Sequence, residues 1–192
     1  MTRMEGMTTQ PVEDIKIFAN QCILMRSTYL HRKTLFEERE LLLRTAAIFF
    51  GDFFHMSREY LILLVCKITD PAKSGDKENI TTEFLLTHYD FTTEPQKAQA
   101  LKELNEKMQV FRSKLVPARN KLISHSDRIS IRDGHALGGV ANNEWDEFWL
   151  NLQEFVYIIY QKVFGQSMYI NGVGGLSDAH SLLRALKQSA CF

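Results

Sequence analysis

The segment that most constrains the fold covers about residues 37–69 and is apolar on more than one side of a helix. A helix at a protein surface needs one apolar stripe, whereas a helix that is apolar on several sides must be covered by several neighbours. The apolar side chains are those of Leu41, Leu42, Leu43, Phe49, Phe50, Phe53, Phe54, Leu61, Ile62, Leu64 and Val65. The segment therefore predicts a long central helix inside a bundle.

Helical signals continue along most of the chain, and no strand-like alternation of apolar and polar residues persists anywhere. Clusters of proline, glycine and charged residues predict loops at 70–79 and 134–143 and a hinge at 172–176. Pro117 must bend or interrupt its helix, because proline lacks a backbone N–H and its ring clashes with the preceding turn. Predicted helices begin near Pro11 and cover about 37–69, 81–88, 93 to beyond 121, 144–164 and 177–188. The expected fold class is all-α, a bundle of four to five main helices with short flanking helices.

A length of 192 residues predicts one domain over 1–192, with a core at about 12–165. The last helix, about 177–188, is either part of that core or an appendage. No apolar run reaches the roughly 18 residues that a membrane span needs, so no membrane segment is expected. Cys22 and Cys66 lie among apolar neighbours, which predicts buried thiols and a reducing, cytoplasmic location.

The charge is balanced overall but not along the chain. There are 23 basic and 23 acidic residues, which argues against a protein that coats nucleic acid by bulk electrostatics. Between Lys107 and Arg132, however, seven basic residues stand against one acid, Asp127. Two interpretations remain open: an anion-binding stripe, or a solvated helix face paired with acids of a neighbouring helix such as Glu144.

The stretch RNKLISHSD, from Arg119 to Asp127, combines an arginine, an amide, a histidine and a carboxylate near a predicted helix end. Arginine grips phosphate oxygens with a planar fork of N–H donors, and the charge of histidine changes near neutral pH. Cleavage of RNA by general acid–base catalysis needs one group to take the 2′-hydroxyl proton and another to protonate the leaving oxygen. His125 supplies one such group.

Arg119 and His125 would lie roughly 120° apart around an ideal helix. They converge if the helix is bent at Pro117 or ends before His125, or if the convergence is between two chains. A twofold dimer would place two copies of both residues around one cleft and would supply the second histidine.

The neighbouring polar residues have two interpretations. As parts of a site, Asn120 and Lys121 would add phosphate contacts, and Asp127 would orient or acidify the imidazole. As structural residues, an arginine and a histidine would complement the dipole at the helix C-terminus, while Ser124 and Asp127 would cap and stop the helix.

RNKLISHSD resembles the signature of the HEPN superfamily, in which a polar residue directly follows the arginine and four to six residues separate the arginine from a histidine. Asn120 fills the polar place, and five residues separate Arg119 from His125. The segment EYLILLVCKITDPAKSGDKENIT (59–81), followed by ARNKLISHSD, also resembles the AbiU-like HEPN domains that are associated with phage abortive infection. The likeness covers roughly residues 30–165.

This resemblance implies a four- or five-helix bundle that dimerises with its motif helices facing each other. Many such domains are metal-independent endoribonucleases without a cofactor, and they leave a 2′,3′-cyclic phosphate. By position, His125 would be the acid/base, Arg119 the phosphate clamp and Asn120 the residue that positions the site. Lys121 and three residues of the following stretch are the predicted substrate-binding set: Ser124, Asp127 and Arg128.

The expected partners are RNA, a second copy that completes a composite active site, and an antitoxin or regulatory protein. The rival interpretation is a helical module without catalysis, which binds a protein or a nucleotide-like ligand and uses Arg119 and His125 only as contacts. Fold resemblance does not decide between the two.

Overall fold

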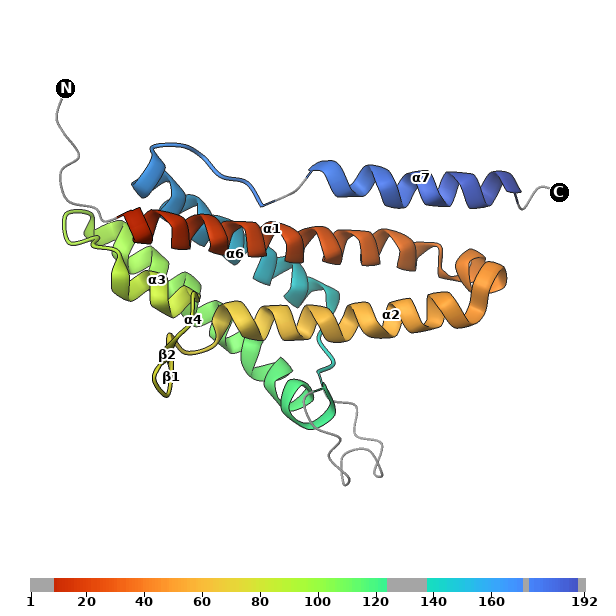
Figure 1. Ribbon diagram of the computed structural model, residues 1–192, viewed down its shortest axis with the longest axis horizontal. Coiled ribbons are helices and arrows are strands. Elements are labelled where there is room, and N and C mark those ends of the chain that lie inside the picture. Colours follow the sequence, from red (N-terminus) through yellow and green to blue (C-terminus); the bar gives the residue numbers. More distant parts are fainter. Residues whose placement is uncertain (1–8, 124–137, 171–172, 190–192) are drawn as a thin grey trace.

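The computed structural model describes residues 9–123, 138–170 and 173–189, in which the regular elements are helices apart from one small hairpin (Figure 1). The elements in chain order are α1 (Thr9–Glu37), α2 (Arg39–Thr69), β1 (Lys73–Ser74), β2 (Lys77–Glu78), α3 (Thr82–His88), α4 (Pro95–Ala118), the π-helix η1 (Arg119–Ile123), α6 (Asn142–Phe164) and α7 (Val173–Ser189). The α-helices pack as a bundle, which confirms the predicted all-α fold class.

Helices α1 and α2 form a long hairpin and lie side by side over most of their length (Figure 1). The chain reverses at Glu38, whose backbone N–H bonds the Leu35 carbonyl at 3.2 Å and whose carbonyl accepts from Leu42 N at 3.1 Å. Helix α2 is kinked at Ala46, where φ −153° and ψ 79° leave the helical region. Its first turns therefore cross the closed end of the hairpin instead of continuing straight.

The main core lies between α1, the second half of α2, α4 and α6, and α3 closes one end. Phe18, Leu115, Phe148 and Phe155 are almost completely buried there. The central-helix prediction holds for the second half of α2, whose buried residues include Leu61, Ile62, Leu64, Val65, Cys66 and Ile68. It is wrong for the first half, where none of the described residues covers the outer face: Ile48 is 83% and Phe49 66% exposed.

The aromatic residues of α6 belong mainly to this core. Phe155 faces Phe18 from α1 at 6.2 Å between ring centroids, and Phe148 stacks on Phe111 from α4 at 4.7 Å. Trp145, at the start of α6, stacks on Tyr29 at 5.4 Å. The helix therefore joins α1 to α4 through ring packing.

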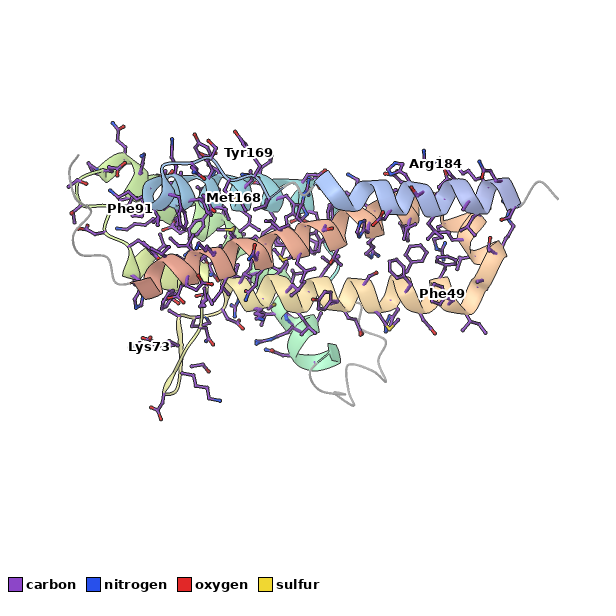
Figure 2. All side chains as sticks on the ribbon, turned by 45° about the horizontal axis from the view of Figure 1, so that its top comes forward. Phe49, Lys73, Phe91, Met168, Tyr169 and Arg184 are labelled. Atoms are coloured by element: carbon purple, nitrogen blue, oxygen red, sulfur yellow. The ribbon has the colours of Figure 1, made fainter. Side chains whose placement is uncertain are left out.

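Helix α7 covers the far half of the α1–α2 hairpin, as both views show (Figures 1 and 2). A second, smaller apolar cluster lies beneath it, formed by Leu35, Leu42, Phe50, Phe54, Ala179 and Leu183. At the tip, Lys187 Nζ donates to Glu38 Oε1 at 2.6 Å. The helix begins at Val173, so the predicted hinge at 172–176 is wrong for Val173 onward, where the backbone is helical.

The predicted loop at 70–79 contains the two-residue strands β1 and β2, in which Lys73 pairs with Glu78. The chain turns through Gly75, whose φ of +61° is a conformation that glycine adopts without steric cost. Asn79 N bonds the Ala72 carbonyl at 2.8 Å, and Ala72 N bonds Glu83 Oε2 of α3 at 2.8 Å. These bonds fix the path of the chain just after α2.

Cys22 and Cys66 are buried free thiols, as predicted. None of the helices in the described ranges is long and apolar enough to cross a membrane.

Candidate functional site

The candidate site begins at the C-terminal end of helix α4, which contains Pro117 in its last turn and ends at Ala118. The following five residues form the π-helix η1, and the Arg119 N–H reaches the carbonyls of Leu115 and Val116. Proline breaks the regular hydrogen-bond ladder of an α-helix. A π-helix has a wider turn than an α-helix, and short π-helices often occur at functional sites. The prediction that the helix is interrupted immediately before Arg119 is confirmed.

Gly138, which has φ +72°, packs against Ala118 at the end of α4. A Cβ built on Gly138 would lie 2.7 Å from Ala118 Cβ and 3.4 Å from Ile62 Cδ1. Only glycine therefore allows the backbone to approach so closely here. Ala118, the residue before Arg119, is buried and packs against the chain at Gly138.

Arg119 is held by Asp70, which follows the last residue of α2. Arg119 NH2 donates to Asp70 Oδ2 at 2.9 Å, while Arg112 NH2 from α4 donates to Asp70 Oδ1 at 2.5 Å. One carboxylate therefore joins two guanidinium groups that are two turns apart on the same side of α4. Arg119 NH1 also approaches Asn120 Oδ1 at 3.4 Å.

Asp70 caps the C-terminal end of α2, with φ −64° and ψ 162°. A carboxylate is unfavourable there on its own, because the free carbonyls give this end of a helix a partial negative charge. The two guanidinium groups offset that cost. Gln109 of α4 adds a further link, since its Nε2 donates to the carbonyl of Thr69 at 2.8 Å.

The three charged side chains are partly buried: 18% of Asp70, 21% of Arg112 and 32% of Arg119 is exposed. Arg119 is the most accessible of the three, and a guanidinium has five N–H donors. One donor bonds Asp70 and another is directed at Asn120, so further donors remain for an anion at the surface. The arrangement fixes the direction of the Arg119 side chain before any ligand binds.

Cys66 lies one turn before Asp70 and within the field of this charged group. Burial raises the pKa of its thiol; the two arginines act in the opposite direction and Asp70 in the same one. The thiol therefore stays protonated at neutral pH and is a packing residue rather than a nucleophile.

The structure describes three of the seven predicted site residues. Arg119 and Asn120 are brought together on η1, and Lys121 is exposed on the same short helix. The other four lie outside the described residues: Ser124, His125, Asp127 and Arg128.

Two residues of the site, Asp70 and Arg112, were not predicted. Arg112 appeared only as part of the basic stretch, and Asp70 only as part of a loop. The available signal was the dipeptide Asp70-Pro71 at the end of a long helix, since a residue before proline leaves the helical region. Nothing in the sequence indicated which basic residues this carboxylate would meet.

Three basic residues of the stretch pair with acids of other elements, while the anion-binding interpretation stays a prediction. Lys114 forms an ion pair with Glu144 of α6, as the helix-pairing interpretation expected. Arg112 and Arg119 instead share Asp70 of α2. Lys121 is exposed beside them.

His55 and Glu59 on α2, which are four residues apart, form a pair at 3.2 Å, and 71% and 36% of their side chains are exposed. Among the described residues there is no group of three or more His, Cys, Asp or Glu side chains that could hold a metal ion.

This helical bundle has the arrangement expected of a HEPN domain. An arginine and a polar residue lie at an interrupted helix end, and a histidine follows six positions after the arginine in the sequence. The family model for AbiU2 HEPN domains matches residues 15–169, so the chain belongs to the AbiU2 family of the HEPN superfamily. HEPN domains are commonly ribonucleases of defence systems. No curated protein and no solved structure matches the chain.

Proposed function

We propose that this protein is a metal-independent endoribonuclease of a phage-defence or toxin–antitoxin system. The observation that carries the proposal is the fixed guanidinium of Arg119, which Asp70 holds at a helix interruption with part of its donor set open to solvent. Family membership supports the same chemistry.

In the proposed reaction, the ribose 2′-hydroxyl attacks the adjacent phosphorus in line with the leaving 5′-oxygen. The new 2′-O–P bond closes a 2′,3′-cyclic phosphate, and the P–O5′ bond breaks. His125 takes the 2′-hydroxyl proton or returns a proton to the 5′-oxygen. Arg119 balances the charge that develops on the phosphorane oxygens, and its preorganised position lowers the cost of doing so.

The motif supplies one histidine per chain, His125, which leaves the second proton transfer without a group. A twofold dimer, with its η1 segments facing each other, would bring a second His125 to the same phosphate. Asn120 would position the site, while four residues would contact the RNA on either side of the cleaved bond: Lys121, Ser124, Asp127 and Arg128. An antitoxin or regulatory protein would hold the activity in check.

The first test is cleavage of a mixed RNA pool in excess EDTA. The wild-type protein should cut and leave 2′,3′-cyclic ends, while His125→Ala and Arg119→Gln should each lose activity by at least about 100-fold. Arg44→Gln, a change of the same chemistry at an exposed site on α2, should cut like the wild type. No cutting by wild-type protein against varied RNAs would refute the proposal.

The composite site has its own test. When wild-type and His125→Ala proteins are unfolded together and refolded as an equal mixture, about half of the dimers carry a single His125. If both copies are needed at one phosphate, those mixed dimers are inactive, and the mixture should have about half the activity of the same amount of wild-type dimer alone. Activity equal to that of the wild-type dimer alone would restrict each site to one chain.

A second function, a binding module without catalysis, is favoured by one observation: Asp70 already satisfies part of Arg119, as in a structural ion pair. In that case Arg119→Gln would lower stability, and RNA would remain intact with every variant.

A further inference from the structure

Helix α2 carries an apolar face that none of the described residues covers. Phe49 is 66%, Met56 60%, Tyr60 43% and Leu63 37% exposed. Figure 1 shows α1 and α7 on one side of α2, whereas α4 crosses only its C-terminal half. At 3.6 residues per turn, the four side chains lie within about 60° of one another around the helix. They therefore form one continuous surface, which we call the α2 stripe.

The α2 stripe has the size of an interaction surface. Its four side chains together expose about 400 Å², which is as much as the largest apolar patch of a typical monomer, and such patches are often functional. A specific interface buries about 800 Å² on each partner. The stripe would therefore supply about half of one such interface, and the polar residues along its edges would supply the rest.

Three members of the stripe repeat every seven residues: Phe49, Met56 and Leu63. A seven-residue apolar repeat is the pattern with which two helices pack along their length. The backbone of α2 leaves the helical region only at Ala46, so the repeat stays on one face from Phe49 to the end of the helix. The next position of the repeat is Asp70. The stripe is thus suited to a second helix that lies along α2, and it points to the carboxylate of the candidate site.

The charges beside the stripe favour a second copy of α2 in parallel orientation. Asp52 and Glu59 lie on one edge of the stripe and Tyr60 lies on the other. In an antiparallel twofold pair the same edges meet, so Asp52 of one copy would lie beside Glu59 of the other, and the two negative charges would repel. In a parallel pair opposite edges meet, so the Tyr60 hydroxyl can donate to Glu59 of the second copy. Glu59 Oε1 lies 3.2 Å from His55 Nε2 in its own chain, and the other oxygen remains for this bond.

We propose that a second copy of this chain packs on the α2 stripe, with the two α2 helices parallel. Phe49, Met56 and Leu63 would each meet their own counterparts along the twofold axis. Because Asp70 follows Leu63 by one heptad, both Asp70–Arg119 ion pairs would lie at the same end of the dimer and close to its axis. The interface itself does not depend on the ribonuclease function, whereas its role in a composite active site rests on that proposed function.

Cysteine cross-linking tests the orientation of the two helices. The full chain carries Cys191→Ser, and the other two cysteines are buried. Under mild oxidation, Phe49→Cys and Leu63→Cys should each give a disulfide-linked dimer alone, because residues beside a parallel twofold axis meet their own copies. Val110→Cys, at a 63% exposed position of α4, is the matched control and should run as a monomer on a non-reducing gel. Cross-linking that appears only when Phe49→Cys and Leu63→Cys are mixed would overturn the parallel arrangement.

Met56→Glu tests whether the stripe holds the dimer together, because it places two negative charges against each other at the centre of the interface. In sedimentation velocity over a range of concentrations, its dimer dissociation constant should be about 10- to 100-fold above that of the wild type. Leu150→Glu, at a 72% exposed position of α6, is the control and should match the wild type. Thermal unfolding checks that both variants fold. A monomeric wild type, or an equally stable dimer of Met56→Glu, would overturn the inference.

Cleavage of RNA separates this inference from the proposed function. A folded, monomeric Met56→Glu protein that no longer cuts RNA supports both the interface and the composite site. A monomeric variant that cuts as fast as the wild type supports the interface and refutes the composite site. Wild-type protein that dimerises through the stripe and cuts no RNA supports the interface and refutes the ribonuclease proposal alone.

Discussion

The Asp70→Asn substitution tests the ion pair that holds Arg119. Asparagine keeps the size of aspartate but removes the charge, and its NH₂ group cannot accept the bond that one of the two arginines donates. Hydrogen bonds to charged groups contribute about 1.5–3 kcal/mol each when well shielded, whereas exposed pairs contribute about 0–1 kcal/mol.

The side chains of Asp70, Arg112 and Arg119 are 18%, 21% and 32% exposed, which places the pair between those limits. The variant also leaves two partly buried positive charges without a counter-charge. We therefore expect the free energy of unfolding to fall by about 2 kcal/mol. For a chain of this length that corresponds to about 4–8 °C in Tm.

The assay is urea unfolding, with the midpoint compared at constant m-value. Asp52→Asn on the exposed surface of α2 is the matched control and should change stability by less than about 0.5 kcal/mol. In a double-mutant cycle, Asp70→Asn and Arg112→Gln should be non-additive by at least about 0.5 kcal/mol. Equal stability of Asp70→Asn and Asp52→Asn would refute the view that this carboxylate anchors the site.

Three further changes test other parts of the structure. Gly138→Ala should lower the free energy of unfolding, measured in urea, by about 1–3 kcal/mol, because Gly138 has φ +72° and the new Cβ would lie 2.7 Å from Ala118 Cβ of α4. The control Gly139→Ala, whose Cβ would have nothing within 4 Å, should lower it by less than about 0.5 kcal/mol. Equal effects would contradict the close packing of Gly138 on α4. Leu183→Ala, at a 7% exposed position of α7, should lower the free energy of unfolding by about 2–5 kcal/mol. The control Leu182→Ala, at a 41% exposed position, should lower it much less. A reversed order would mean that α7 does not pack as described. Burial, and to a lesser extent the carboxylate of Asp14, raises the pKa of Tyr89 from 10.0 to about 12. The folded state therefore keeps a proton that the unfolded state loses, and the free energy of unfolding should fall as the pH rises above 10. Tyr89→Phe should reduce this pH dependence of the urea midpoint, and an unchanged slope would exclude the effect.

The sequence by itself determined the features that depend on neighbouring residues. The helical period of the apolar side chains predicted the bundle, and Pro117 predicted the break before Arg119, because a missing N–H and a ring clash act within one turn. Cys22 and Cys66 were predicted as buried from the apolar residues beside them. The order of residues from Arg119 to Asp127, together with the segment 59–81 and the helical pattern, indicated the superfamily.

Tertiary structure alone decided which distant groups meet. Asp70 bonds arginines that are 42 and 49 positions away, and no local pattern selects those partners. It also decided that Phe49 is exposed while Phe50 is buried, since the kink at Ala46 and the position of α7 determine which side of α2 is covered. The pocket lined by Arg32, Arg58 and Trp145 is another such case, because its walls come from α1, α2, the segment 138–140 and α6. Short-range sterics and hydrogen bonds are written in a few adjacent residues, whereas these contacts exist only after the helices have packed.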